Sequence, residues 1–172
     1  MQFWTIILAA VVAAPALGAH NIADTVSKIQ SLGNDVDSVQ RALDSYNGGT
    51  LRALPVANAI YNAHMSAEDA RKDLGNSDPF NTDEGSQLLD AYHEIHPRLA
   101  SVLSTGSAKV APQFKQAGVG YVARSMLSNL YIEKNSFDDQ MKTVLSPEHY
   151  RMVEPQAQEI DREFKNTLDA YS

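Results

Sequence analysis

Residues 22–49 read IADTVSKIQSLGNDVDSVQRALDSYNGG, and the spacing of their apolar side chains is the strongest indication of the fold class. Its large apolar side chains recur at intervals of three and four residues, which is the period of an amphipathic helix and not of a strand. They are Ile22, Val26, Ile29, Leu32, Val36, Val39, Leu43 and Tyr46. Asn21 is a typical helix-starting residue, and the Asn-Gly-Gly run at 47–49 is a strong stop signal. Residues 22–46 are therefore predicted to form one long helix.

The same period continues beyond the stop signal. A second helix is predicted to begin at Thr50 as its N-cap and to run to about Gly75, with a side made mostly of large apolar residues. These are Leu51, Leu54, Tyr61, Met65 and Leu74, with Ala57 among them. A third helix is predicted over about residues 82–104, interrupted by Pro97, and residues 105–118 are predicted to be looser.

Two more helices are predicted over residues 119–145 and 147–171. The run Ser-Pro-Glu at 146–148 combines an N-cap serine, a proline at the first helical position and an acid in the first turn. Pro155 lies well inside the last helix, as Pro97 does in the third, and each is expected to kink its helix. Five amphipathic helices with short connections predict an all-α fold, an antiparallel bundle.

The N-terminal segment has a different character. Residues 3–17 read FWTIILAAVVAAPAL without a charge, and the small residues Gly18 and Ala19 follow. The run is too short to span a bilayer, which takes about 20 residues. We predict a signal peptide over residues 1–18, with cleavage after Gly18 or Ala19, and a helical-bundle domain over residues 19–172. The product is expected to be secreted and extracellular, with no transmembrane segment.

The charge of the chain restricts its partners. The sequence has 14 basic and 21 acidic residues, which gives a net charge of −7. Nucleic acids and anionic membranes are bound through clustered Lys and Arg, so we expect neither as the main partner. The chain contains no cysteine, so no disulfide and no thiol chemistry are expected.

The sequence offers little catalytic or metal-binding machinery. Asp90, His93 and His96 share about a third of a helix circumference and form the best metal candidate. A catalytic zinc site needs three protein ligands, a water and usually a nearby base, so the two histidines are interpreted as surface or boundary residues. No Gly-x-Ser-x-Gly nucleophile motif and no glycine-rich phosphate loop occurs. We expect no enzyme activity, no metal and no cofactor.

Several stretches resemble one known family. They are Val39-x-x-Ala42-Leu43-x-x-Tyr46-Asn47-Gly48-Gly49, Leu54-Pro55-Val56-x-x-Ala59 and Ile160-Asp161-x-x-Phe164-x-x-x-Leu168-Asp169-Ala170-Tyr171. In these patterns the chain resembles fungal secreted proteins of the hydrophobic surface-binding protein A type, a family that also contains cell-wall galactomannoproteins. The resemblance implies an extracellular five-helix bundle that adsorbs to hydrophobic surfaces or encloses a lipid such as a fatty acid. It also implies the cell wall as an alternative location.

Three functions are compatible with these observations. The leading hypothesis is a protein that binds a fatty acid or another apolar small molecule between the third, fourth and fifth predicted helices, where the two prolines lie. The predicted wall of this site consists of Leu88, Tyr92, Ile95, Leu99, Met126, Leu130, Ile160 and Phe164. The second is a surfactant-like protein that adsorbs to a hydrophobic surface and helps an enzyme to dock there. The third is a structural or antigenic cell-wall protein without a ligand.

Overall fold

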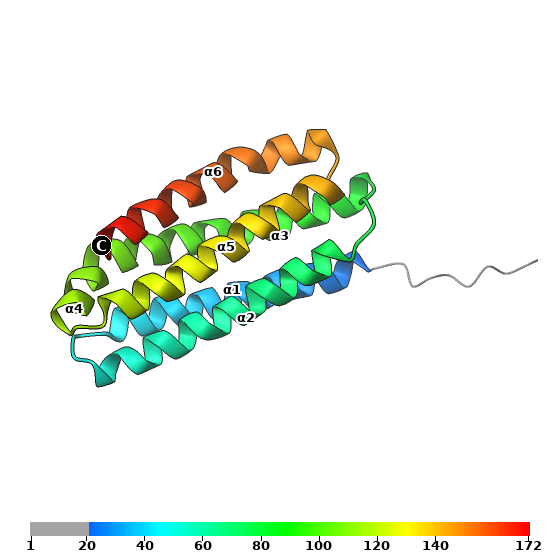
Figure 1. Ribbon diagram of the computed structural model, residues 1–172. Coiled ribbons are helices and arrows are strands. Elements are labelled where there is room, and N and C mark those ends of the chain that lie inside the picture. The colour runs from blue at the N-terminus through cyan, green and yellow to red at the C-terminus, as the bar shows by residue number, and fades with distance from the viewer. Residues whose placement is uncertain (1–20) are drawn as a thin grey trace, which may run out of the picture.

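The computed structural model describes residues 21–172, so the predicted signal peptide at residues 1–18 lies outside the described residues. Five long helices form the molecule, and between residues 21 and 172 no strand is present (Figure 1). The helices are α1 (Ile22–Ser45), α2 (Leu54–Gly75), α3 (Thr82–Thr105), α5 (Gly120–Val144) and α6 (Pro147–Ala170). Successive long helices run in opposite directions, which confirms the predicted antiparallel all-α bundle.

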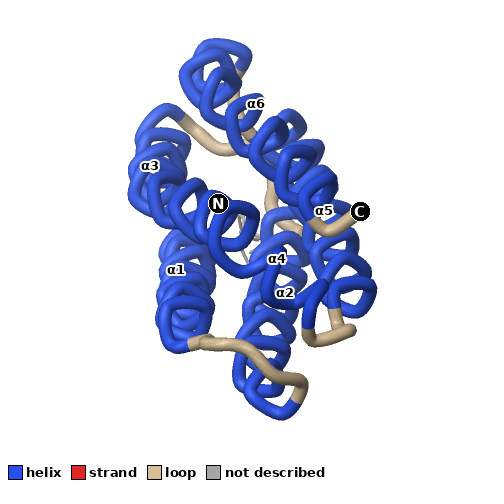
Figure 2. Tube along the Cα trace, turned by 90° about the vertical axis from the view of Figure 1, so that its left-hand side faces the viewer, coloured by secondary structure: helices blue, strands red, loops and turns tan. Residues whose placement is uncertain are grey.

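The five helices close a ring. α1 packs against α2 and α3, α2 packs against α5, and α6 packs against both α3 and α5 (Figure 2). The seam between α5 and α6 is the most sparsely packed of these five. Buried apolar side chains form two clusters, one around Leu43 and Phe114 and the other around Leu88 and Met141. No helix in the described part of the chain combines the length and apolar character needed to cross a membrane.

The predicted starts of α1 and α6 agree with the structure. Oδ1 of Asn21 accepts the backbone N–H of Ala23 at 3.0 Å, and Oγ of Ser146 accepts the N–H of His149 at 3.2 Å. The predicted cap of the second helix is wrong. The Thr50 side chain caps nothing and instead donates to the carbonyl oxygen of residue 117 at 3.1 Å, which ties the α1–α2 connection to the turn before α5.

The predicted apolar side of α2 is correct at Leu74, which is completely buried, but wrong for its other large residues. Leu51, in the 3₁₀ turn η1 (Leu51–Ala53), is 81% exposed, and Leu54 is 63% exposed, while Tyr61 and Met65 also reach the surface. The buried stripe instead carries mostly small side chains: Val56, Ala59, Ala63, Ala70 and Leu74. Both stripes have the helical period, and the small one allows α2 to approach its neighbours closely.

The segment after α3 is not loose. It continues as a π-helical turn, η2 (Gly106–Val110), and a short helix, α4 (Ala111–Gln116). The ring of Phe114 is buried with its centroid 4.6 Å from that of Tyr46 in an edge-to-face contact. The Tyr171 hydroxyl donates to the carbonyl oxygen of Gly106 at 3.2 Å and so satisfies a backbone group of the π turn. These contacts order a segment whose glycines and proline suggest a loop.

Candidate functional site

An apolar cavity of about 120 Å³ lies inside the ring of helices. All five long helices line it, and most of the lining side chains are aliphatic or aromatic. The lining residues of α1 are Ile29, Leu32, Val36, Val39 and Leu43, and those of α2 are Ile60, Ala63 and Ala67. Because these helices turn apolar side chains inward, the walls of the cavity are apolar.

The cavity is long and narrow. On α5 its lining extends from Ala123 to Asp138, which corresponds to about 22 Å along a helix. One lipid leaflet accounts for half of the hydrocarbon core of a bilayer, so an acyl chain spans about 15 Å. The length therefore suits an acyl chain. A cavity of roughly 150 Å³ holds a single benzene molecule, so lining side chains must move apart before a whole chain can enter.

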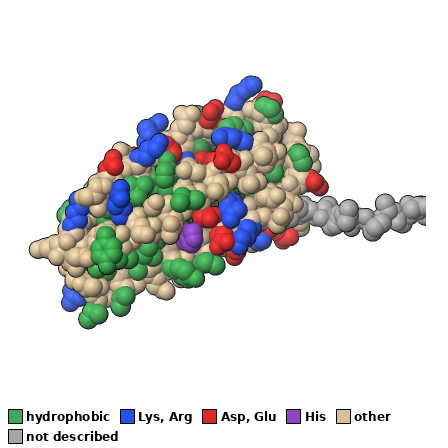
Figure 3. Space-filling view, viewed as in Figure 1, with side chains coloured by type: hydrophobic (Ala, Val, Ile, Leu, Met, Phe, Trp, Pro, Cys, Tyr) green, Lys and Arg blue, Asp and Glu red, His purple; other side chains and the backbone are tan. Residues whose placement is uncertain are grey.

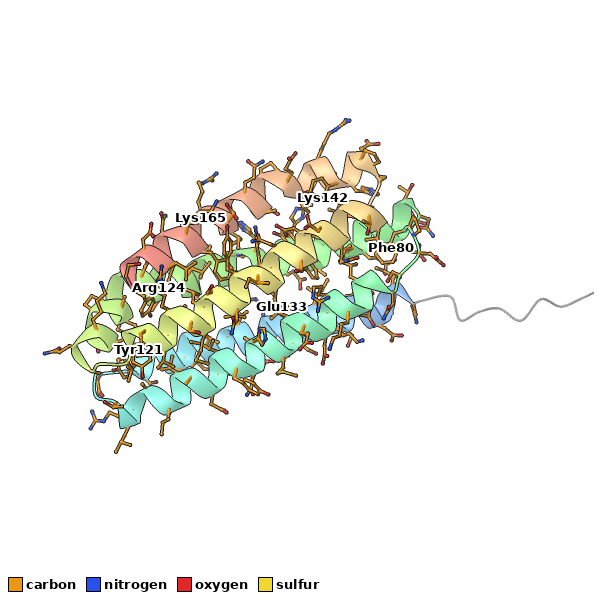
Figure 4. The ribbon with its side chains drawn as sticks, in the orientation of Figure 1. Phe80, Tyr121, Arg124, Glu133, Lys142 and Lys165 are labelled. Carbon is orange, nitrogen blue, oxygen red and sulfur yellow. The ribbon has the colours of Figure 1, made fainter. Side chains whose placement is uncertain are left out.

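One side of the cavity is polar and belongs to α5. Glu133 (labelled in Figure 4), Lys134 and Asp138 line it there. Glu133 is paired with Arg71 of α2 at 2.6 Å. Nζ of Lys134 lies 2.8 Å from Oδ2 of Asp138 and 3.7 Å from Oδ1 of Asp161. Since Asp161 belongs to α6, charged side chains bridge the sparsely packed α5–α6 seam beside the cavity.

Two titratable groups of the cavity are shifted by burial. Burial raises the pKa of Asp138, although the hydrogen bond from Lys134 opposes the shift. Burial also raises the pKa of Tyr92 far above its usual range, with the Asp138 charge as a smaller cause. Tyr92 therefore remains a neutral phenol at physiological pH.

Six of the eight residues predicted to form the lipid site line this cavity. They are Tyr92, Ile95, Leu99, Leu130, Ile160 and Phe164. Leu88 does not line it: the cavity lining on α3 begins at Tyr92, one turn further along the helix, and Leu88 packs in the cluster with Met141. Met126 does not line it either. It is partly exposed on α5, one position away from the inward stripe that contains Ala123 and Leu127.

The sequence-based site omitted two helices. The cavity walls contributed by α1 and α2 were not predicted, although the apolar period of α1 is the signal that could have indicated them. Lys134 and Asp138 were also missed; their i, i+4 spacing on the inward side of α5 is a recognisable pattern. The two helix prolines were expected to mark the site, but Pro97 and Pro155 are exposed and line no part of it.

The metal candidate of the sequence is not assembled into a cluster. Within residues 21–172, no three His, Cys, Asp or Glu side chains lie close enough together to hold a metal ion. Nε2 of His96 instead lies 3.4 Å from Oε2 of Glu159 on α6. This contact places His96 at the α3–α6 interface.

Comparison with known families identifies the chain. The sequence profile described as hydrophobic surface binding protein A matches residues 22–143, which is more than half of the chain. The chain belongs to the hydrophobic surface binding protein A family. This finding confirms the family resemblance seen in residues 39–49 and 54–59. No curated protein sequence matches the chain.

Solved structures share the fold of this hydrophobic surface binding protein A family member. The structure of AFMP4P in complex with palmitic acid superposes with a TM-score of 0.84 at 18% identity, and the match covers 88% of this chain and 100% of that one. Ligand binding domain 1 of Penicillium marneffei MP1 protein, complexed with arachidonic acids, gives 0.80 at 14% identity over 90% and 99% of the two chains. Ligand binding domain 2 of the same protein, complexed with multiple arachidonic acids, superposes with a TM-score of 0.82 at 17% identity, and the match covers 88% of this chain and 96% of that one.

Proposed function

We propose that this protein binds one long-chain fatty acid or a closely related apolar molecule inside the helical ring, as a binding protein and not as an enzyme. The observation that carries this proposal is the elongated apolar cavity, lined by all five long helices. Proteins of the same fold have been solved with palmitic and arachidonic acids, which supports it. Each methylene that leaves water contributes about 0.8 kcal/mol, so an acyl chain can offset the cost of moving the lining side chains apart.

Affinity for fatty acids is expected to rise with chain length. A series from octanoate to stearate should bind with simple stoichiometry, and the affinity should stop rising when the cavity is full. Bound ligand should also raise the melting temperature, because a ligand selective for the folded state stabilises it by mass action. Calorimetry and thermal melts below the micellar concentration measure both effects. Neither saturable heat nor a thermal shift with any chain would contradict the enclosed site.

A second function, adsorption to hydrophobic surfaces, is favoured by a different part of the molecule. Leu51, Leu54, Tyr61 and Tyr121 are exposed around the start of α2 and the start of α5. The Thr50 hydrogen bond to residue 117 holds these two starts together. Apolar side chains gather over this end of the bundle (Figure 3), and Tyr121 lies there (Figure 4). Exposed apolar patches of this kind mark interaction surfaces.

Removing the exposed leucines should weaken adsorption without affecting ligand binding. The double variant Leu51→Ser/Leu54→Ser is expected to bind hydrophobic beads several-fold less, because two of the most exposed apolar side chains are lost. Bead-depletion isotherms measure the effect. Ile132→Ser/Met152→Ser removes two exposed apolar side chains from other positions on α5 and α6 and is the matched control. Equal losses in both variants would argue against a defined adsorption surface.

We also propose that the protein is exported after cleavage of its signal peptide behind Gly18 or Ala19. The uncharged apolar run at residues 3–17 and the small residues after it support this proposal. The product in culture medium is expected to begin at Ala19 or His20. Intact-mass measurement tests this, and an extracellular product that retains Met1 would contradict it.

A further inference from the structure

The positive charge at the polar side of the cavity is already paired with carboxylates. Lys134 is the only cation among the described residues that line the cavity, and it lies within 3.7 Å of two carboxylates, those of Asp138 and Asp161. Asp161 also accepts a hydrogen bond from the Tyr131 hydroxyl and pairs with Lys165 at 2.6 Å. The cavity therefore offers no cation without a carboxylate partner to an incoming anion.

The same region contains an acceptor without a donor. Asp138 is 8% exposed, and among the described residues its Oδ1 has no hydrogen-bond partner, whereas Oδ2 is bound by Lys134. The ion pair with Lys134 at 2.8 Å favours the ionised form of Asp138, and an ionised carboxylate can only accept hydrogen bonds. Leaving a buried acceptor unpaired costs stability, so a ligand group that donates to Oδ1 gains that free energy on binding.

From this geometry we infer that the cavity selects a lipid whose head group is uncharged and donates a hydrogen bond to Oδ1 of Asp138. A fatty alcohol meets this requirement, and a fatty acid meets it as the protonated acid. The inference rests on the proposed lipid-binding function. A carboxylate head would instead add a third negative charge beside Lys134 and would leave Oδ1 without a donor.

The other groups around Asp138 are consistent with this preference. On α5 these are Lys142 and Asp139 in addition to Lys134; Tyr92 faces Asp138 from α3, and Tyr150 from α6. Burial raises the pKa of both tyrosines, so they add no charge at neutral pH. Lys142 is itself paired with Asp139 at 3.3 Å. None of these groups supplies the positive charge that an anionic head would need.

Three ligands with the same chain length separate the possibilities. Hexadecanol, methyl palmitate and palmitate are delivered from cyclodextrin at pH 7.5, and their dissociation constants are measured by calorimetry. Hexadecanol is expected to bind about tenfold more tightly than methyl palmitate, which has no donor for the charged acceptor. The affinity for hexadecanol should also exceed the affinity for palmitate by about tenfold or more, because palmitate must take up a proton or bring its charge into the cavity. Palmitate binding more tightly than hexadecanol would overturn the inference and leave the proposed function intact.

A pair of variants links the preference to one side chain. Asp138→Asn removes the charge and adds a donor, so the ratio of hexadecanol to palmitate affinity should fall by about tenfold or more. Asp139→Asn makes the same chemical change on the adjacent residue, whose side chain is 74% exposed, and should leave the ratio unchanged. An unchanged ratio in folded Asp138→Asn would also overturn the inference. If Asp138→Asn does not fold, the series on the unaltered protein still decides. If none of the three ligands binds, the proposed function fails and the inference fails with it.

Discussion

Leu99→Asp is expected to abolish binding of a long-chain fatty acid while the bundle stays folded. Leu99 lines the cavity from α3 and packs against both core clusters, so an aspartate there would be an unpaired carboxylate on the path of the acyl chain. The cost of such a buried charge is several kcal/mol, which corresponds to a loss of affinity of about 100-fold or more. Calorimetry measures the loss, and far-ultraviolet circular dichroism checks that the helices remain.

Met126→Asp is the matched control for this substitution. It introduces the same side chain on α5, but Met126 is partly exposed and does not line the cavity. Its affinity for the fatty acid should therefore stay within about threefold of the unaltered protein, the usual range for substitutions away from a buried feature. A folded Leu99→Asp protein that still binds normally would show that the ligand lies elsewhere.

Leu88→Ala is expected to lower the free energy of unfolding by about 2–5 kcal/mol, because truncation of a fully buried leucine removes apolar burial and leaves a cavity. Leu88 is completely inaccessible and lies in the cluster with Met141, outside the ligand cavity. The ligand preference of the folded protein should therefore be unchanged. Urea denaturation followed by circular dichroism measures the stability.

Leu54→Ala makes the same change on the surface. Leu54 is 63% exposed, so its truncation should change the free energy of unfolding by no more than about 0.5 kcal/mol. If Leu88→Ala lowered the free energy of unfolding as little as Leu54→Ala, burial of Leu88 in the cluster with Met141 would not stabilise the fold.

The hydrophobic period predicted the long helices well, and it failed where two stripes competed. In α1 a single apolar face exists, so the period alone identified the helix and most of its buried residues, although it missed Thr25 and Gly33. In α2 the large residues around Leu51 and Leu54 form one stripe and the alanines form another. The choice between them depends on how closely neighbouring helices approach, which is a tertiary property that no local pattern contains.

The site was predictable only in part for a related reason. Helical facing placed Tyr92, Leu99 and Phe164 correctly on the inward side of their helices. Whether an inward residue contacts a cavity or a packed core depends on its level along the bundle, and this is why Leu88 was misplaced. The partners of Lys134 and Asp138 come partly from α6, so their arrangement required the α5–α6 pairing to be known.

The cavity also determines how the protein responds to hydrostatic pressure. Pressure favours states of smaller volume, and unfolding removes internal voids. A void of about 120 Å³ per molecule corresponds to roughly 70 mL per mole, which lies within the range of volume changes seen for whole proteins. Without a ligand, the bundle should therefore unfold at a lower pressure than a cavity-free bundle of its size. A bound acyl chain occupies that volume, so the ligand protects the protein against pressure by filling space as well as by mass action.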